Sequence, residues 1–147
     1  MGYADYGQTT TSEQRPYLPG EIYMGLFDTI LGNASETNTE AVNEELKPIL
    51  AENETVTAAF KLVRDLTVFT NKRLIIIDKQ GLTGRKVNYH SIPYKSITQF
   101  VVETAGHFDT DAELKIWLSG KSEAIEIELS KSSAQGVQKN LANQMFA

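Results

Sequence analysis

The sequence contains no cysteine among its 147 residues. Disulfides, zinc–thiolate sites, iron–sulfur clusters and cysteine nucleophiles are therefore excluded. No apolar run approaches the roughly 18–20 residues that a membrane-spanning helix needs. Residues 1–12 are polar and lack the apolar centre of a secretion signal, so we expect a cytoplasmic protein.

Positive charge is also in short supply. The 14 Lys and Arg residues are outnumbered by 19 Asp and Glu residues, which leaves a formal net charge of −5. Nucleic-acid binding usually requires a basic face, so the composition disfavours that class of partner. The hydrophobic fraction of 41% and the charged fraction of 22% are those of an ordinary globular protein. A chain of this length suits one domain.

Residues 1–23 show neither a helical nor a strand period. Pro16 and the pair Pro19-Gly20 favour turns or extended chain. Two interpretations stay open: a flexible leader that precedes a natural start at Met24, or a tail that packs through its tyrosines. We therefore divide the chain into an N-terminal extension, residues 1–23, and a domain, residues 24–147.

A first helix is predicted from Glu36 to Leu50. Thr37 and Glu40 have the spacing of a capping box, in which a hydroxyl and a carboxylate satisfy free backbone amides. Four apolar residues fall on one face at helical spacing: Val42, Leu46, Ile49 and Leu50. Pro48 lacks the amide hydrogen that would bond to Glu44, so we expect the helix to kink or tighten there.

Between residues 54 and 130 the apolar period changes to two, which indicates strands. The predicted runs are Val56–Leu62, Leu66–Thr70, Arg73–Asp78, Arg85–Tyr89, Ile97–Glu103, Leu114–Leu118 and Ala124–Leu129. Residues 74–77 are continuously apolar, as in a strand that is buried on both faces.

Residues 132–146 return to a helical period, with Ser132 or Ser133 as the predicted cap. The apolar stripe of this helix is Ala134, Val137, Leu141 and Met145. About seven consecutive strands with no helix between them predict an antiparallel meander. We expect a mainly β (α+β) fold, in which a barrel or two orthogonal sheets are capped by the C-terminal helix.

Six blocks of sequence, taken in order, resemble the bacterial pleckstrin-homology domain family. The blocks are Met24–Asp28, Phe69–Leu74, Asp78–Gly81, Ser91–Ile97, Val102–Gly106 and Ala112–Leu118. The resemblance implies a PH-like fold and a non-enzymatic domain without a cofactor. It also implies assembly into cyclic homo-oligomers, and a polar surface near strand ends that binds an unidentified protein partner.

Charge is distributed unevenly along the predicted strands. Residues 61–95 contain eight Lys or Arg and two Asp, whereas residues 97–130 contain two Lys and seven Asp or Glu. One interpretation is a head-to-tail ring, in which basic strands of one copy face an acidic edge of the next. The other is neutralisation within one subunit. The candidate contact cations are Arg64, Lys72, Arg73, Arg85 and Lys86.

Trp117 and Lys115 are the candidate contact residues of the sixth strand. Alternation places Leu114 and Ile116 inside, so Lys115 and Trp117 point outward. An outward tryptophan is a suitable anchor for an interface. The alternative is that the first helix, the N-terminal tail or residues 24–27 cover Trp117.

Other kinds of chemistry find little support. The first hairpin region, residues 61–66, has two cations and one acid, too few for a phosphate-binding site, so membrane lipid is not an expected partner. Asp109, Asp111 and Glu113 resemble the start of a calcium loop but lack its later glycine and glutamate, so no metal site is expected. His90 and His107 have no visible nucleophile or acid partner, so no catalytic residue is expected.

Three functional hypotheses follow. The preferred one is a homo-oligomeric, protein-binding scaffold that performs no catalysis. The first alternative is a peripheral membrane adaptor that uses the basic strands. The second is a carrier of a small ligand in the barrel mouth, which bulky strand residues should fill.

Overall fold

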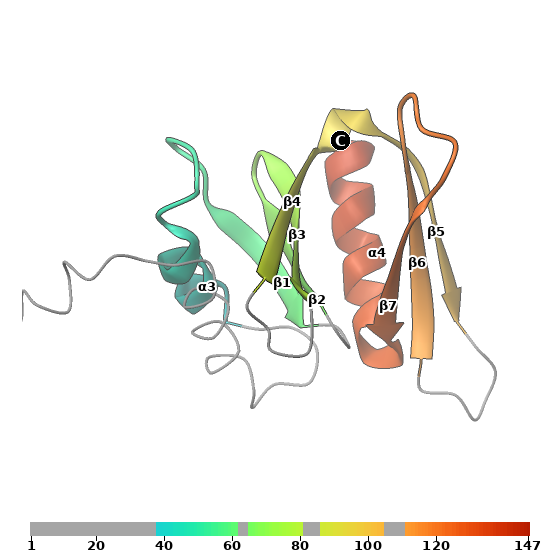
Figure 1. The fold of residues 1–147 in the computed structure, drawn as a ribbon, viewed down its shortest axis with the longest axis horizontal. Coiled ribbons are helices and arrows are strands. Elements are labelled where there is room, and N and C mark those ends of the chain that lie inside the picture. The colour runs from blue at the N-terminus through green and yellow to red at the C-terminus, as the bar shows by residue number, and fades with distance from the viewer. Residues whose placement is uncertain (1–37, 62–64, 81–85, 105–110) are drawn as a thin grey trace, which may run out of the picture.

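The computed structural model describes residues 38–61, 65–80, 86–104 and 111–147. In chain order these ranges form a helix, four strands, a short 3-10 helix, three strands and a final helix (Figure 1). The predicted order of elements is confirmed. The proposed division at residues 23 and 24 lies outside the described residues and stays a prediction.

The first helix, α3 (Thr39–Leu46), is shorter than predicted. Asn38 caps it, because its Oδ1 accepts hydrogen bonds from the amides of Glu40 and Ala41 at 3.0 and 3.2 Å. Thr37, the predicted cap, lies outside the described residues. The predicted extension to Leu50 was wrong: the chain after Leu46 forms tight turns around Pro48, as expected of a residue without an amide hydrogen.

Seven strands form two antiparallel sheets. The first sheet has the order β1-β2-β3-β4 and the second has the order β5-β6-β7, joined by the 3-10 helix η1 (Tyr94–Ser96). The strands are β1 (Val56–Lys61), β2 (Asp65–Thr70), β3 (Arg73–Gln80), β4 (Lys86–Pro93), β5 (Ile97–Thr104), β6 (Asp111–Leu118) and β7 (Ile125–Ser130). Of the two predicted arrangements, the structure has two sheets and not a closed barrel.

Strand β3 separates two hydrophobic clusters, as its continuously apolar sequence predicted. Leu74 and Ile76 belong to the cluster that packs against the final helix. Ile75 and Ile77 belong to a second cluster that includes Val42 and Leu46 of α3. Successive side chains of a strand point to opposite faces, so four adjacent apolar residues require cover on both.

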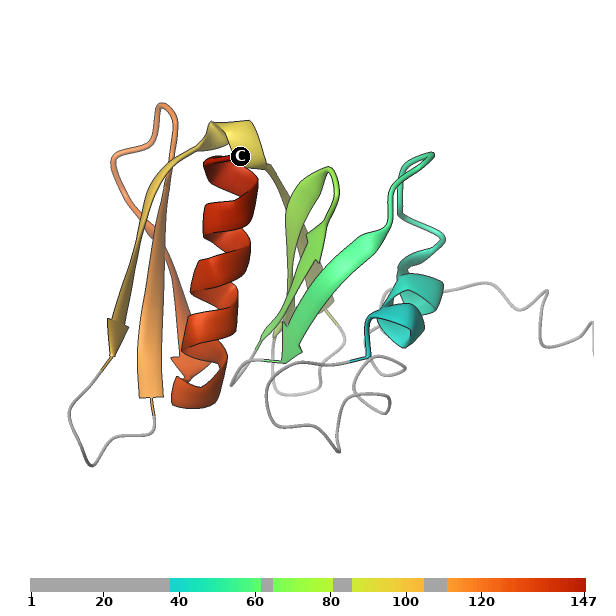
Figure 2. The same cartoon turned by 180° about the vertical axis from the view of Figure 1, so that it is seen from behind.

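The final helix, α4 (Lys131–Met145), packs between the two sheets (Figure 2). Its N-cap position is Ser130, not the predicted Ser132 or Ser133. The predicted stripe is largely confirmed, because Ala134, Val137 and Leu141 are buried and Met145 packs against the same cluster. The helix therefore caps the interior, as expected.

Candidate functional site

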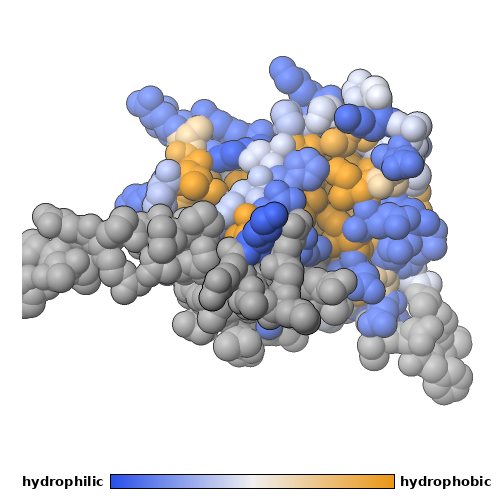
Figure 3. Space-filling model, in the orientation of Figure 1, coloured by the Kyte–Doolittle hydropathy of each residue, from blue (hydrophilic) through white to orange (hydrophobic). Residues whose placement is uncertain are grey.

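The outer face of the second sheet points away from α4. It carries Gln99, Val101 and Glu103 of β5, Glu113, Lys115 and Trp117 of β6, and Glu126 and Glu128 of β7. The alternating residues Leu114 and Ile116 are fully buried in the core. Lys115 and Trp117 thus lie on the predicted face. Figure 3 shows mainly hydrophilic side chains over this side of the molecule, and hydrophobic ones between the sheets.

Lys115 lies on β6, the central strand of the second sheet, among three carboxylates from three strands. Its Nζ is 3.4 Å from Glu113 Oε1, and 3.9 Å from both Glu103 Oε1 and Glu126 Oε1. The hydrogen bond to Glu113 and the negative charges of all three carboxylates raise the pKa of Lys115. One ammonium cannot balance three carboxylates, so the surroundings of Lys115 keep a negative charge.

The outer face changes character along its length. Trp117 is half-buried opposite Gln99, close to the end of β6 that meets η1. Val101, opposite Lys115, is 39% exposed. The other end holds a shallow hollow of about 310 Å³. Its lining residues are Glu103, Thr104, Asp111, Ala112, Glu113 and Glu128. The face thus runs from an aromatic end to an acidic end.

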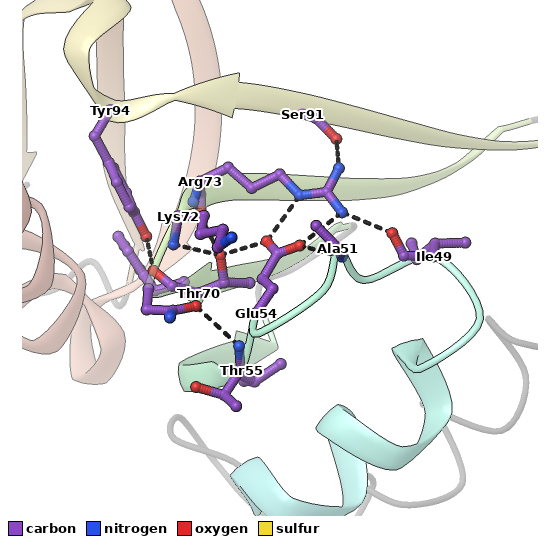
Figure 4. Close-up of polar contacts among 12 residues, drawn as sticks. Ile49, Ala51, Glu54, Thr55, Thr70, Lys72, Arg73, Ser91 and Tyr94 are labelled. Atoms are coloured by element: carbon purple, nitrogen blue, oxygen red, sulfur yellow. Dashed lines mark hydrogen bonds and ion pairs between the residues drawn. The ribbon is translucent and has the colours of Figure 1, made fainter.

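Arg73 takes part in a buried polar network, which we call the Glu54 network (Figure 4). Its Nε and NH2 groups donate to the two carboxylate oxygens of Glu54 at 2.9 and 3.1 Å. The guanidinium also donates to the Ile49 carbonyl at 2.8 Å and to Ser91 Oγ at 2.7 Å. Its donors are therefore largely used inside the subunit, and its contact with a partner stays a prediction.

Glu54 has no solvent-exposed side-chain surface in this network. Its carboxylate also accepts hydrogen bonds from Thr70 Oγ1 at 2.6 Å and from the Ala51 amide at 2.7 Å. Burial by itself raises the pKa of Glu54, but the bonds from Arg73, Thr70 and Ala51 outweigh burial and lower it to about 2. The network joins the turn after α3 to the β2–β3 hairpin.

Of the other predicted cations, the structure describes Lys72 and Lys86, which lie at opposite ends of the first sheet. Lys72 lies beside Arg73 in the hairpin, exposed, and its Nζ donates to the Glu52 carbonyl at 2.9 Å. Lys86 is exposed at the start of β4, opposite Gln80, so it lies at the other end of the sheet. Arg64 and Arg85 lie outside the described residues. Within the described ranges, the candidate contact cations Lys72 and Arg73 thus lie at one end of the first sheet and Lys86 lies at the other.

Sequence reasoning missed the seam between β5 and the end of α4. The ring centroids of Phe100 and Phe146 are 6.4 Å apart, and Phe146 is 72% exposed. One signal in the sequence pointed to this seam. Lysine and proline usually protect an edge strand from pairing with another chain, and β5 contains neither.

The remaining sequence candidates are less informative. His90 is exposed on β4, opposite Ile76. His107 and Asp109 lie outside the described residues. No helix in the described ranges is long and apolar enough to cross a membrane.

Comparisons with known proteins agree on one family. A family model described as "Bacterial PH domain" matches residues 25–145. The uncharacterized protein YjqA of Bacillus subtilis (strain 168) is 60% identical over 121 residues, which cover 81% of this chain and 97% of that protein.

Two solved structures show the same resemblance. The crystal structure of a pleckstrin homology domain from Shewanella amazonensis SB2B is 54% identical, with a TM-score of 0.71; the match covers 84% of this chain and 100% of that one. A DUF1696 family protein with a pleckstrin-homology domain from Shewanella loihica PV-4 is also 54% identical, with a TM-score of 0.68. That match covers 77% of this chain and 97% of that one.

Proposed function

Since this chain belongs to the bacterial PH domain family, we propose a function of two parts. The protein is a non-enzymatic, protein-binding scaffold, and its copies assemble into a cyclic homo-oligomer. The observation that carries the proposal is the outer face of the second sheet. There a half-buried tryptophan and an exposed valine lie beside a cross-strand charge cluster.

This composition is typical of protein–protein interfaces. Tryptophan is enriched among the residues that dominate binding energy, and such residues are usually surrounded by polar groups that exclude water. Trp117 and Val101 would form the apolar centre, and Lys115 with its three carboxylates would form the polar rim. Rim charges select the orientation and rate of association more than its strength.

The charge distribution favours contacts between unlike surfaces. The outer face is acidic, whereas Lys72 and Lys86 are exposed cations of the first sheet. A contact between two different surfaces of the same chain closes into a ring when the rotation permits. The contacts of Arg73 within the subunit make it a weaker candidate for the interface than Lys72.

Multi-angle light scattering of the full chain tests the assembly. We expect one closed multimer at concentrations on the order of 10 µM, whose mass is a whole multiple of the 16.3 kDa chain. A chain that stays monomeric at about 100 µM contradicts the oligomeric part of the proposal, because a standard interface is saturated there.

A further inference from the structure

The second sheet has an open edge at β5. Within the described residues, β5 pairs with β6 on one side and with no strand on the other. Figures 1 and 2 both show β5 on the outside of the molecule, with α4 on the inner face of the sheet. An open edge leaves a row of backbone donors and acceptors that another strand can pair with.

Exposed apolar surface is concentrated at this same edge. Among the described residues, the large hydrophobic side chains that are exposed are Val101 and Phe146. Val101 lies on β5 itself, and Phe146 lies beside Phe100 of β5. The two mark opposite faces of the strand, since Val101 is on the outer face and Phe100 packs against the core. An added strand would therefore find an apolar neighbour on each face.

The charge of β5 indicates which kind of strand could pair with its open edge. The sequence of β5 contains one charged residue, Glu103, and no cation. Glu103 faces Glu113 across the ladder, at the acidic end of the outer face. The other edge of the sheet, β7, carries Glu126 and Glu128, so a second copy that offered β7 would oppose like charges. A segment that places a cation near Glu103 would instead complement the negative charge of the β5 edge.

We propose that the β5 edge binds an extended segment of a different protein as an added strand. The segment would pair its backbone with β5, place apolar side chains beside Val101 and Phe146, and place a lysine or arginine beside Glu103. In this mode main-chain hydrogen bonds supply affinity and alternate side chains supply specificity. The inference rests on the proposed function, because it identifies the class of partner that the scaffold would bind.

A library of random peptides displayed on phage is the probe, with the full chain as bait. Peptides that also bind the Val101→Lys variant are removed, because a lysine on an edge strand is a natural block to pairing. We expect the remaining peptides to alternate β-branched or aromatic residues and to carry Lys or Arg near one end. If no peptide is enriched for the wild type over Val101→Lys, the inference is wrong.

Synthetic forms of one selected peptide test strand addition directly. Alternate backbone amides of an extended peptide point to opposite edges. One form is N-methylated at the amides that point to one edge of the peptide, and the other form at the amides that point to the opposite edge. Only the form whose methylated amides face β5 should bind more weakly, by at least about tenfold in fluorescence anisotropy. Equal binding of both methylated forms and the unmodified peptide contradicts pairing through the backbone.

Substitutions at the seam test the apolar neighbour. Phe146→Ala should weaken peptide binding about fivefold to tenfold, since an exposed phenylalanine would be covered by the peptide. Gln135→Ala, at an exposed position of α4, is the matched control and should bind as the wild type does. Gln135→Lys adds the same charge as Val101→Lys at an exposed position of α4, so it should bind the peptide as the wild type does. Thermal denaturation checks that each variant is folded.

Light scattering of the same samples separates this inference from the proposed function. If the selected peptide breaks up the wild-type multimer, but the form methylated along the edge that pairs with β5 does not, the edge is occupied by a second copy, which overturns the inference and leaves the homo-oligomer standing. If the wild type is monomeric but binds the peptide at the edge, the homo-oligomer fails and the inference stands.

Discussion

Glu54 and Arg73, 19 residues apart in the chain, form an ion pair through two hydrogen bonds in which the carboxylate is fully buried. Glu54 precedes β1, and Arg73 begins β3, so the pair ties the turn after α3 to the first sheet. Because Thr70 and the Ala51 amide bind the same carboxylate, its charge is compensated from three directions. The pair thereby fixes how α3 and its cluster lie on the sheet.

Loss of the carboxylate should therefore destabilise the fold. We expect Glu54→Ala to lower the free energy of unfolding by about 3 kcal/mol, because it leaves the Arg73 guanidinium partly buried without its counter-charge. Urea denaturation measures the change. Glu52→Ala, at an exposed position in the same turn, is the control and should change stability by less than about 0.5 kcal/mol. Similar losses in both variants would contradict a specific role for the pair.

Acid should weaken the fold through the same group. The pKa of Glu54 is lowered from 4.5 to about 2 in the folded state, so its contribution is complete above about pH 4.5 and is lost as the pH falls towards 2. That shift corresponds to about 3 kcal/mol. We expect the stability advantage of the wild type over Glu54→Gln to shrink by about this amount over the window. Urea denaturation in a series of buffers measures it, and curves that stay parallel would exclude Glu54 as the titrating group.

Gly136 of α4 allows the helix to approach Phe60 of β1 closely. A Cβ atom at position 136 would lie 2.7 Å from Phe60 Cε1 and 2.8 Å from Phe60 Cζ, closer than van der Waals contact permits. We therefore expect Gly136→Ala to destabilise the protein by about 2 kcal/mol, although alanine is the better helix former by about 1 kcal/mol.

Denaturation of the single and double variants tests this explanation. Phe60→Leu should remove part of the clash, so Gly136→Ala should cost less in that background. Gln135→Ala, at an exposed position of the same helix, should be neutral or slightly stabilising. A Gly136→Ala protein that is more stable than the wild type would show that the two elements separate at little cost.

Removal of the Trp117 side chain should weaken assembly or partner binding more than stability. The side chain is only half-buried in the subunit, so we expect Trp117→Ala to cost about 1 kcal/mol of folding but at least about tenfold in association. Light scattering and thermal denaturation, measured together, separate the two effects. Gln99→Ala, which removes the residue opposite Trp117, is the matched control.

A Trp117→Ala variant with unchanged assembly but a large loss of stability would assign the tryptophan to packing within the subunit. That result would support the alternative interpretation of the sequence, in which other parts of the same chain cover this side chain.

The sequence by itself determined the order of elements and the face on which most side chains lie. Alternation predicted that Lys115 and Trp117 point outward, and the apolar run at residues 74–77 predicted a strand covered on both faces. These features are local, because the backbone geometry of a strand fixes the direction of each side chain relative to its neighbours. The predicted bounds of α3 were wrong because two other local signals decided them: Asn38 caps the helix, and the turns around Pro48 end it early.

The tertiary structure decided which distant residues meet. Nothing in the periodicity pairs Glu54 with Arg73, separates Lys72 from Lys86, or brings Phe146 beside Phe100. Such contacts depend on strand register and on the path of α4 between the sheets, and both follow from packing of the whole core. For that reason Arg73, a candidate contact cation in the sequence, is the partly buried partner of Glu54 in the fold. The open β5 edge likewise became visible only in three dimensions.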